Sequence, residues 1–334
     1  MTTLTAYPTH AKNWATRFFV TREMAIIYLL VAVVVVSSLA VPKFAGQQTL
    51  YYLIMDILPT LMIALPMTMI MITGDIDISV GSMLGLTCSL IGLLFSLGVP
   101  FGLAMILAIV VGALGGLFNG LLVTRIGLPA LAVTIGTMAL FRGIAVGLLG
   151  TKAVTSFPKA WTNFSKAKLF GSGFPVVTLI FLALFVVFIA LLHFTSFGRG
   201  VYAIGLNKEA AQFSGVDVSR TRTILFVLAG AMSGLGGIYY TLRFGTARGD
   251  VGDGLELQVI AAIVLGGVSV FGGRGAMHGA IAGVILIGVL SSALRLIGVT
   301  ADVIKIITGV LLILSVIIGA VLAWIGSRRS AKGS

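Results

Sequence analysis

The sequence predicts an all-α, polytopic membrane protein of about ten transmembrane helices. Of its 334 residues, 58% are hydrophobic and only 10% are charged, and the mean hydropathy is +1.15. A water-soluble domain cannot cover its surface with so few polar residues. In addition, apolar runs long enough to cross a bilayer recur along the whole chain. We therefore expect one helical bundle that is solvated mainly by lipid.

The apolar runs are bounded by proline, glycine or charged residues, and each is near the length that a spanning helix requires. The eighth run is short and rich in glycine, so a broken or re-entrant segment is the alternative there. Such a segment is tolerated only where protein or a water-filled cavity covers its backbone. In chain order the runs are 24–41, 50–73, 80–97, 101–122, 128–149, 175–195, 222–242, 257–271, 276–297 and 303–325.

Basic residues between the runs predict the orientation, because short cytoplasmic loops carry an excess of Lys and Arg. A cytoplasmic N-terminus places 12 of the 22 basic residues inside. Four of the others lie in one long outer loop, at Lys152, Lys159, Lys166 and Lys168. An even number of spans then returns the C-terminus to the cytoplasm. The same basic residues are scattered instead of forming one patch, so anionic lipid, not nucleic acid, is the expected partner.

The predicted organisation is one transmembrane domain over 24–325 between cytoplasmic segments 1–23 and 326–334. Five spans lie on each side of the longest cytoplasmic loop, 198–222, which would suit two inverted halves. Glycine is abundant inside the spans, as in 112–116 and 230–234, where small residues let helix backbones approach closely. We interpret these glycines as helix-packing positions.

The long cytoplasmic loop contains a predicted short helix that begins after Asn207. Asn207 can cap the first amides, and Glu209 lies in the first turn, where the helix dipole favours an anion. Gly215 suits a left-handed exit. The helix is either a docking element for a soluble partner or a solvated connector.

The segment Glu209-Ala210-Ala211, followed by Gly215, resembles the EAA-type loop of ABC importer permeases. The later Ile-x-Leu-Pro part of that loop motif is missing, which indicates a particular branch of the ABC importer permeases. Three further stretches resemble the ribose-type permease family, in the same order and spacing over about residues 24–325. They are GDIDISVGS at 74–82, AIGLN at 203–207, and AAIVLGG at 261–267 with GGRG at 272–275.

Within this family, three segments look most like the autoinducer-2 and rhamnose permeases: 63–69, 157–164 and 244–250. The resemblance implies a permease subunit of an ATP-driven importer of a monosaccharide or sugar-like solute in the bacterial inner membrane. It also implies a separate ATPase that binds ATP and Mg²⁺, a periplasmic or lipid-anchored solute-binding protein, and a second permease subunit, identical or related. The loop residues Asn207, Glu209, Ala210, Ala211 and Gly215 would then contact the ATPase.

The segment 74–82 interrupts two spans with two carboxylates and a hydroxyl group. Asp75 and Asp77 are candidates for the cytoplasmic end of a translocation path, because membrane carboxylates are costly unless hydrated or paired. The alternative is a capped turn between helices, and for Ser79 helix capping is the preferred interpretation. Asn119 and Thr134, inside spans, either contact a solute or bond another helix, and the second is preferred.

Charges near the outer ends of the spans have simpler interpretations. Arg142 and Lys305 lie inside predicted spans, and we expect their long side chains to reach the headgroups. In the outer loop before the eighth span, Arg248, Asp250 and Asp253 are candidates for docking a solute-binding protein, and a solvated loop is the alternative.

Other classes of function lack the residues that they need. The three histidines are dispersed, there is one cysteine, and no H-E-x-x-H or phosphate-binding loop occurs, so we expect no enzyme activity, no metal site and no cofactor bound by this chain. An ion-coupled secondary transporter of a small neutral solute is the main alternative. Such transporters place carboxylates within the spans, whereas here only Asp56 lies inside one.

Overall fold

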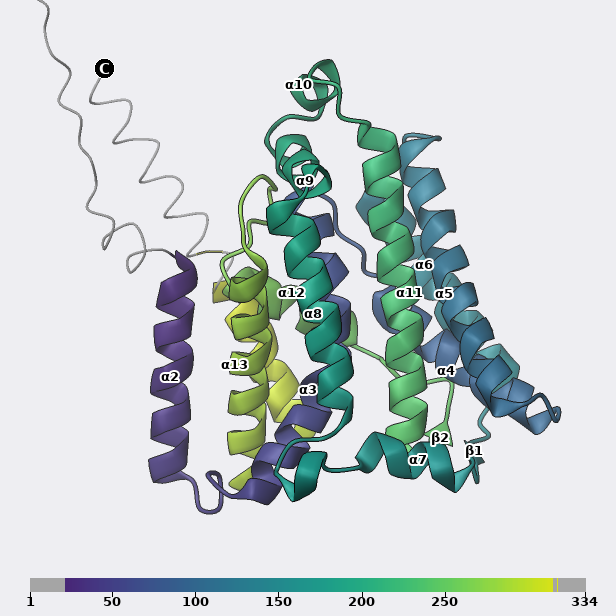
Figure 1. Ribbon diagram of the computed structural model, residues 1–334, viewed down its shortest axis with the longest axis vertical. Coiled ribbons are helices and arrows are strands. Elements are labelled where there is room, and N and C mark those ends of the chain that lie inside the picture. The colour runs from purple at the N-terminus through teal and green to yellow at the C-terminus, as the bar shows by residue number, and fades with distance from the viewer. Residues whose placement is uncertain (1–21, 315–316, 318–334) are drawn as a thin grey trace, which may run out of the picture.

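The computed structural model describes residues 22–314 and residue 317. Their helices pack side by side as one bundle (Figure 1), which confirms the polytopic all-α class. Six helices, α3, α5, α6, α8, α11 and α13, are long and apolar enough to cross a membrane. The helices are α2 (Arg22–Ala40), α3 (Gln47–Ile72), α4 (Val80–Ser96), α5 (Phe101–Thr124), α6 (Ala130–Leu149), α7 (Lys159–Lys166), α8 (Val177–Phe194), α9 (Ser196–Leu206), α10 (Lys208–Phe213), α11 (Val218–Phe244), α12 (Leu255–Leu265) and α13 (Met277–Leu296).

Each predicted run from 24–41 to 276–297 overlaps one of these helices. The last run, 303–325, is helical over 301–314, and most of its remainder lies outside the described residues. The predicted segment 326–334, and 1–23 apart from its last two residues, also lie outside them. The outer loop contains three elements that were not predicted: β1 (Val154–Thr155), the helix α7 and the 3-10 turn η1 (Leu169–Gly171). β1 pairs antiparallel with β2 (Thr246–Ala247).

The centre of the bundle is the pair α3 and α11, which contact each other and span 26 and 27 residues. α3 is apolar all round and is buried along nearly its whole length from Leu53 onwards. A helix that is hydrophobic on every face belongs inside a bundle. α8, α12 and α13 contact α3, while α4 and α5 contact α11.

α5 and α11 approach each other closely through glycine, in agreement with the prediction that glycines inside the spans are helix-packing positions. A side-chain carbon added at Gly112 would overlap the carbonyl oxygen of Gly230, and one added at Gly230 would overlap that of Gly112. Gly116 faces Phe226 in the same way. Only residues without a side chain allow the two backbones to touch at this depth.

The eighth predicted run is a broken segment. α12 has 11 residues, or about 16 Å at 1.5 Å per residue, which is roughly half a hydrocarbon core. The irregular stretch 266–276 follows it and is bonded by protein: the Gly273 amide donates to the Ile72 carbonyl oxygen at 2.8 Å, and the Tyr202 hydroxyl donates to the Gly275 carbonyl oxygen at 2.7 Å. The non-helical backbone is thus satisfied within the bundle, as an apolar environment requires.

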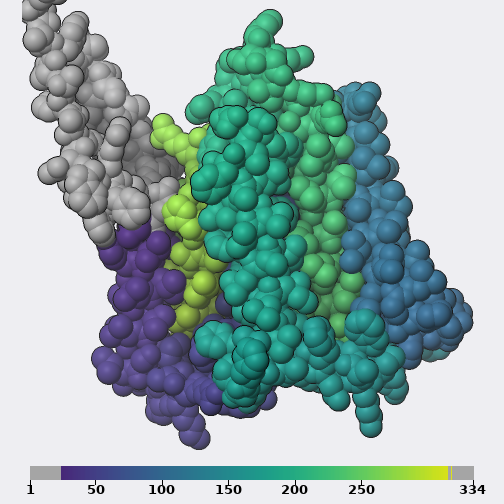
Figure 2. Space-filling view, viewed as in Figure 1, coloured from purple at the N-terminus to yellow at the C-terminus, as the bar shows by residue number. Residues whose placement is uncertain are grey.

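The two ends of the bundle carry different elements. α9 and α10 protrude from one end, and Figure 2 shows them as a knob above the helices. α7, β1 and β2 lie at the opposite end, together with the turn between α2 and α3 (Figure 1). The loop helix of the predicted cytoplasmic side and the outer-loop elements are therefore at opposite ends, as the predicted topology requires.

Candidate functional site

The predicted loop helix is α10, and its caps are those that the sequence indicated. The Asn207 side-chain oxygen accepts from the Ala210 amide at 2.9 Å, Glu209 lies in the first turn, and Gly215 has a φ of +85°. Ala211 is buried against the bundle, whereas Phe213 is 93% exposed. α10 thus directs one large apolar side chain away from the bundle.

Behind α10, Asp75 is the centre of an ion cluster. Arg222, near the start of α11, donates to both carboxylate oxygens of Asp75, with Nε–Oδ2 at 2.5 Å and Nη2–Oδ1 at 2.8 Å. Lys208, the first residue of α10, lies 3.4 Å from Oδ1. The side chain of Asp75 is 6% exposed. Two-pronged contact of this kind is the strongest form of carboxylate recognition by arginine.

The cluster of Asp75, Arg222 and Lys208 links three parts of the chain. Asp75 follows the end of α3, Arg222 belongs to α11, and Lys208 belongs to α10. Lys208 therefore joins α10 to the connection between α3 and α4 by one ionic contact. From the sequence alone Arg222 was only one of the basic residues counted on the cytoplasmic side.

The other polar candidates surround the same connection, residues 73–79. Asp77 Oδ1 accepts from the Ser79 amide at 2.9 Å and from the Ser79 hydroxyl at 2.6 Å. The Asn119 amide donates to the Ser79 hydroxyl at 2.8 Å, and the Thr134 hydroxyl donates to the Ile76 carbonyl oxygen at 3.2 Å. All of these side chains are buried.

Two expectations about these residues need correction. Ser79 stands at the start of α4, but its hydroxyl makes no cap bond to that helix and instead pairs with Asp77 and Asn119. Asn119 and Thr134 do not bond another helix: they bond the 73–79 connection. The polar groups of α5 and α6 thus hold an irregular segment whose own backbone cannot form a helix ladder.

The structure brings Asp75, Asp77, Ser79, Asn119 and Thr134 together, although they come from three separate parts of the sequence. They form a network between segments, and none of them lines the cavity at the other end of the molecule. Their role in translocation stays a prediction.

The outer docking candidates lie on the 245–254 loop. Arg248 and Asp250 form an exposed ion pair, with Nε–Oδ1 at 2.9 Å, and Asp253 is exposed nearby. Arg142 does not extend to the headgroups as expected. Its guanidinium donates to the carbonyl oxygens of Gly249 and Val251 at 2.9 and 2.7 Å, so it fixes this loop against α6.

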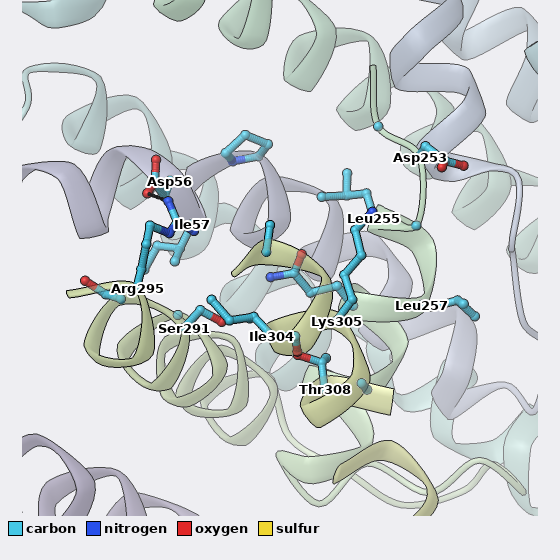
Figure 3. Close-up of a pocket in the computed structure, with 18 of the residues that line it drawn as sticks. Asp56, Ile57, Asp253, Leu255, Leu257, Ser291, Arg295, Ile304, Lys305 and Thr308 are labelled. Atoms are coloured by element: carbon cyan, nitrogen blue, oxygen red, sulfur yellow. Dashed lines mark hydrogen bonds and ion pairs between the residues drawn. The ribbon is translucent and has the colours of Figure 1, made fainter. Parts of the chain in front are cut away.

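Below the same loop is a cavity of about 540 Å³, shown in Figure 3. Its walls come from α3, the end of α11, residues 252–258, α13 and residues 301–312. Asp56 of α3 is paired there with Arg243 of α11 and Arg295 of α13, the latter contact at 3.1 Å. Figure 3 shows Asp56 and Arg295 on one side of the cavity and Asp253 and Leu257 on the other.

Residues 49–316 match the family model described as "Branched-chain amino acid transport system / permease component". The chain belongs to this permease family. The permease is 34% identical over 326 residues to the autoinducer 2 import system permease protein LsrD of Yersinia pestis (strain Pestoides F) and to that of Yersinia pseudotuberculosis serotype O:3 (strain YPIII). The alignments cover 93% of this chain and 97% of each relative. No solved structure matches it.

In the part of the permease that the structure describes, no three His, Cys, Asp or Glu side chains gather as a metal site requires. The charges that do gather are the two ion clusters around Asp75 and Asp56. Sequence reasoning noticed Asp56 as a carboxylate inside a span but assigned it no partner. Arg243 and Arg295 each lie in the last turn of an apolar helix, α11 and α13, and this position could have indicated them as partners of Asp56.

Proposed function

We propose that this permease is the membrane-spanning subunit of an ATP-driven importer for a sugar-like solute, autoinducer 2 or a related compound. The observation that carries the proposal is the likeness to autoinducer 2 import permeases over nearly the full length of both chains. The named family describes permease components of transport systems, which places the chain in a membrane and makes it one part of a larger assembly.

The ATPase, which holds ATP and Mg²⁺, docks at α10 through Asn207, Glu209, Ala210, Ala211 and Gly215. Three features support this: α10 protrudes, it exposes Phe213, and it carries Lys208 into the Asp75 cluster. Movement of α10 during the ATPase cycle then pulls on the α3–α4 connection and on the start of α11. This contact supplies a direct route from the nucleotide-driven subunit to the centre of the bundle.

The solute-binding protein docks at the opposite end, where Arg248, Asp250 and Asp253 are exposed. A second permease subunit, identical or related, completes the membrane part, and membrane lipid covers the remaining apolar surface. In this assembly the α10 end faces the cytoplasm and both chain termini lie there, around one permease domain over 24–325.

Ten spans in two inverted halves are the arrangement that we infer. Each half contains one long central helix, α3 or α11, followed by an irregular connection and a short helix, α4 of 17 residues or α12 of 11 residues. Half-length helices that begin after an irregular connection are typical of transporters built from inverted repeats.

The ion-coupled alternative requires a carboxylate that is free to bind a cation. Asp56 lies within a described span and is the first candidate for such a carboxylate. Its side chain is paired with two guanidinium groups. The buried carboxylates of Asp77 and Glu256 form no ion pair within the described part of the chain, so the uptake test below, and not the pairing of Asp56, separates the two mechanisms.

The test is uptake of autoinducer 2 into vesicles that contain this permease, the ATPase and the solute-binding protein encoded with it. We expect uptake to require ATP and to be lost in Glu209→Lys, with the variant still inserted. Lys43→Glu, a charge reversal on an exposed residue at the opposite end, serves as the matched control and should transport normally. Uptake by the permease alone that follows an ion gradient and survives Glu209→Lys would overturn the proposal.

A further inference from the structure

Glu256 is a buried carboxylate to which the proposed function gives no role. It lies in the first turn of α12 and is 8% exposed. Its Oε2 atom has no hydrogen-bond partner among the described residues. A buried polar atom without a partner is costly, and an ionisable group inside a membrane bundle is by default a candidate for function.

Glu256 and Arg142 occupy adjacent positions on α4. A side-chain carbon added at Gly81 would overlap Oε2 of Glu256, so only glycine leaves room for the carboxylate there. At Gly85 an added carbon would overlap Nη1 of Arg142. Residues four apart on a helix are neighbours on one face, with about 5–6 Å between their Cβ positions. Opposite charges from α12 and α6 therefore meet the same face of α4, one turn apart, without bonding to each other.

Backbone oxygens hold the Arg142 guanidinium in this conformation. Its Nη1 atom donates to the carbonyl oxygens of Gly249 at 2.9 Å and Val251 at 2.7 Å. Arg142 and Asp253 are the charged side chains that act on the Glu256 carboxylate, and of these two only Arg142 has the opposite sign. A guanidinium binds a carboxylate more strongly than a neutral carbonyl group, because both partners are charged and two parallel bonds can form. Arg142 thus has a stronger partner nearby than the ones that it binds.

The bonds from Arg142 fix the segment 249–254, and the same segment forms part of the cavity wall. Gly252, Asp253 and Gly254 line the cavity (Figure 3). Gly252 and Gly254 both have a φ of +77°, in the left-handed region that glycine enters without a steric penalty. A segment with two such residues can change its path at little cost in backbone strain. Release of the two carbonyl groups would therefore change the shape of the wall.

We propose that the Arg142 guanidinium exchanges the Gly249 and Val251 carbonyl groups for the Glu256 carboxylate during the transport cycle, and that this exchange releases the segment 249–254 from α6. The proposal rests on the proposed function, because it assigns the ion pair to the conformation that the ATPase drives. Arg142 and Glu256 are positioning residues in it: they act on the cavity wall and do not contact the solute. A carboxylate that is unpaired in one conformation and paired in the other favours the second, and the carbonyl bonds favour the first.

The first test compares stability and uptake in Glu256→Gln, which keeps the shape of the side chain and removes its charge. We expect uptake of autoinducer 2 by the complete importer to fall more than tenfold, because Arg142 loses its second partner. We expect a melting temperature close to that of the parent, because no bond to Oε2 is lost in the conformation described here. Ser89→Ala, which removes another buried group without a partner from α4, should transport like the parent protein.

Two results of this test would contradict the inference. Normal uptake by Glu256→Gln would show that the charge is not required. A fall in uptake that follows a lowered melting temperature and a lowered amount in the membrane would show that Glu256 only supports the fold.

The second test asks whether the effect of Glu256 requires Arg142. Uptake is measured for Glu256→Gln, Arg142→Gln and the double variant. We expect Glu256→Gln to lower uptake more than tenfold in the parent and less than twofold in the Arg142→Gln background, because both residues act through one bond. Equal fold losses in the two backgrounds would mean that the residues act independently and would overturn the pairing.

The third test reads the movement of the segment without transport. Val251 is 5% exposed, and Val251→Cys in a Cys88→Ser background is treated with a maleimide, in the importer at rest and after trapping with ATP and vanadate. We expect labelling to be at least tenfold faster in the trapped importer and this acceleration to be lost in Glu256→Gln. Ala104→Cys, at a fully buried position of α5, should stay unlabelled in both states. Equally slow labelling of Val251→Cys in both states would refute the release of the segment.

These tests separate the inference from the proposed function. If the parent importer shows no ATP-dependent uptake, the proposed function fails and the inference with it. If the parent importer transports, and Glu256→Gln transports equally well, the function stands and only the exchange between Arg142 and Glu256 is overturned.

Discussion

α3 and α11 are joined by an ion cluster at each end, and each cluster has one carboxylate and two basic side chains but different surroundings. Near the α10 end, Asp75 binds Arg222 and Lys208, and near the other end Asp56 binds Arg243 and Arg295. Each cluster is one carboxylate between two basic groups, one of which comes from α11. The central pair of helices is thus held at both ends by the same chemistry.

The clusters differ in burial. The side chain of Asp75 is 6% exposed and that of Asp56 is 34% exposed, because only Asp56 borders a cavity. When a buried pair loses one partner, the remaining charge is unpaired and poorly solvated. When a hydrated pair loses one partner, water solvates the remaining charge. The Asp75 cluster is enclosed by protein, and the Asp56 cluster borders the cavity.

The largest expected effect follows from removing the buried carboxylate. Asp75→Ala leaves Arg222 without its carboxylate in a closed environment, at a cost of about 3–5 kcal/mol. We expect a strongly lowered melting temperature of the permease in detergent. The double variant Asp75→Ala/Arg222→Met removes both charges and should recover part of the loss. Equal melting temperatures for the single variant and the parent protein would contradict the buried-pair interpretation.

A smaller effect is expected from adding one methyl group at each end. In Gly205→Ala the added carbon overlaps the Ile72 carbonyl oxygen and the Gly273 amide, which are backbone atoms that cannot rotate away. Overpacking of this kind costs about 1–3 kcal/mol. In Gly288→Ala the overlap is with the Cγ2 methyl of Ile57, a side-chain atom that moves when χ1 rotates, unlike a backbone atom. Thermal unfolding should therefore rank Gly205→Ala below Gly288→Ala, and the reverse order would show that the α10 end is not the rigid one.

Removing the hydrated carboxylate should cost less. Asp56→Asn keeps the shape of the side chain, and the pair with Arg295, whose side chain is 63% exposed, contributes about 1 kcal/mol or less. Arg243 is 11% exposed and loses a more enclosed partner, so we expect a melting temperature below that of the parent but above that of Asp75→Ala, together with a loss of uptake, because Arg243 and Arg295 are no longer held in the cavity wall. Measuring the melting temperature and the uptake on one preparation separates the effect on stability from the effect on transport. A loss of stability equal to that of Asp75→Ala would contradict the inference that the two clusters differ in burial.

The smallest stability effect is expected on the outer loop. Arg248→Ala breaks an exposed pair with Asp250, so the free energy of unfolding should change by no more than about 0.5 kcal/mol. If the loop meets the solute-binding protein, the KM for the loaded binding protein should rise and should depend on salt. Lys159→Ala, on exposed α7, is the control for a neutralised charge at the same end.

Most of the fold could be predicted from the sequence, because a helix in lipid requires a long apolar run. Such a run is recognised from consecutive residues, without knowledge of contacts between distant parts of the chain. The limits of α4 and α13 agree with the predicted runs within one residue. α12 ends at Leu265 and not at 271, where the predicted run ended, and the glycines after Leu265 had made a broken segment the alternative. α7 was missed because it is short and polar, and it lies outside the spans.

The sites were accessible only in part, because ion pairing joins residues far apart in the chain. Asp75 was recognised as costly in a membrane, but Arg222 lies 147 positions away, and no local pattern connects them. Asn119 and Thr134 were noticed as polar groups in spans, while their shared partner, the 73–79 connection, depends on how α5 and α6 pack. The Asp56 cavity requires five separate segments and has no signature in any one of them.

The glycine contact between α5 and α11 also sets an order for biogenesis. Gly112 enters the membrane more than a hundred residues before Gly230 is synthesised, so the small-residue face of α5 has no partner while the first half is inserted. An insertase or a lipid must cover that face until α11 arrives. Chains truncated before α11 should therefore be targets for membrane quality-control proteases, and full-length chains should escape them once the two glycines meet.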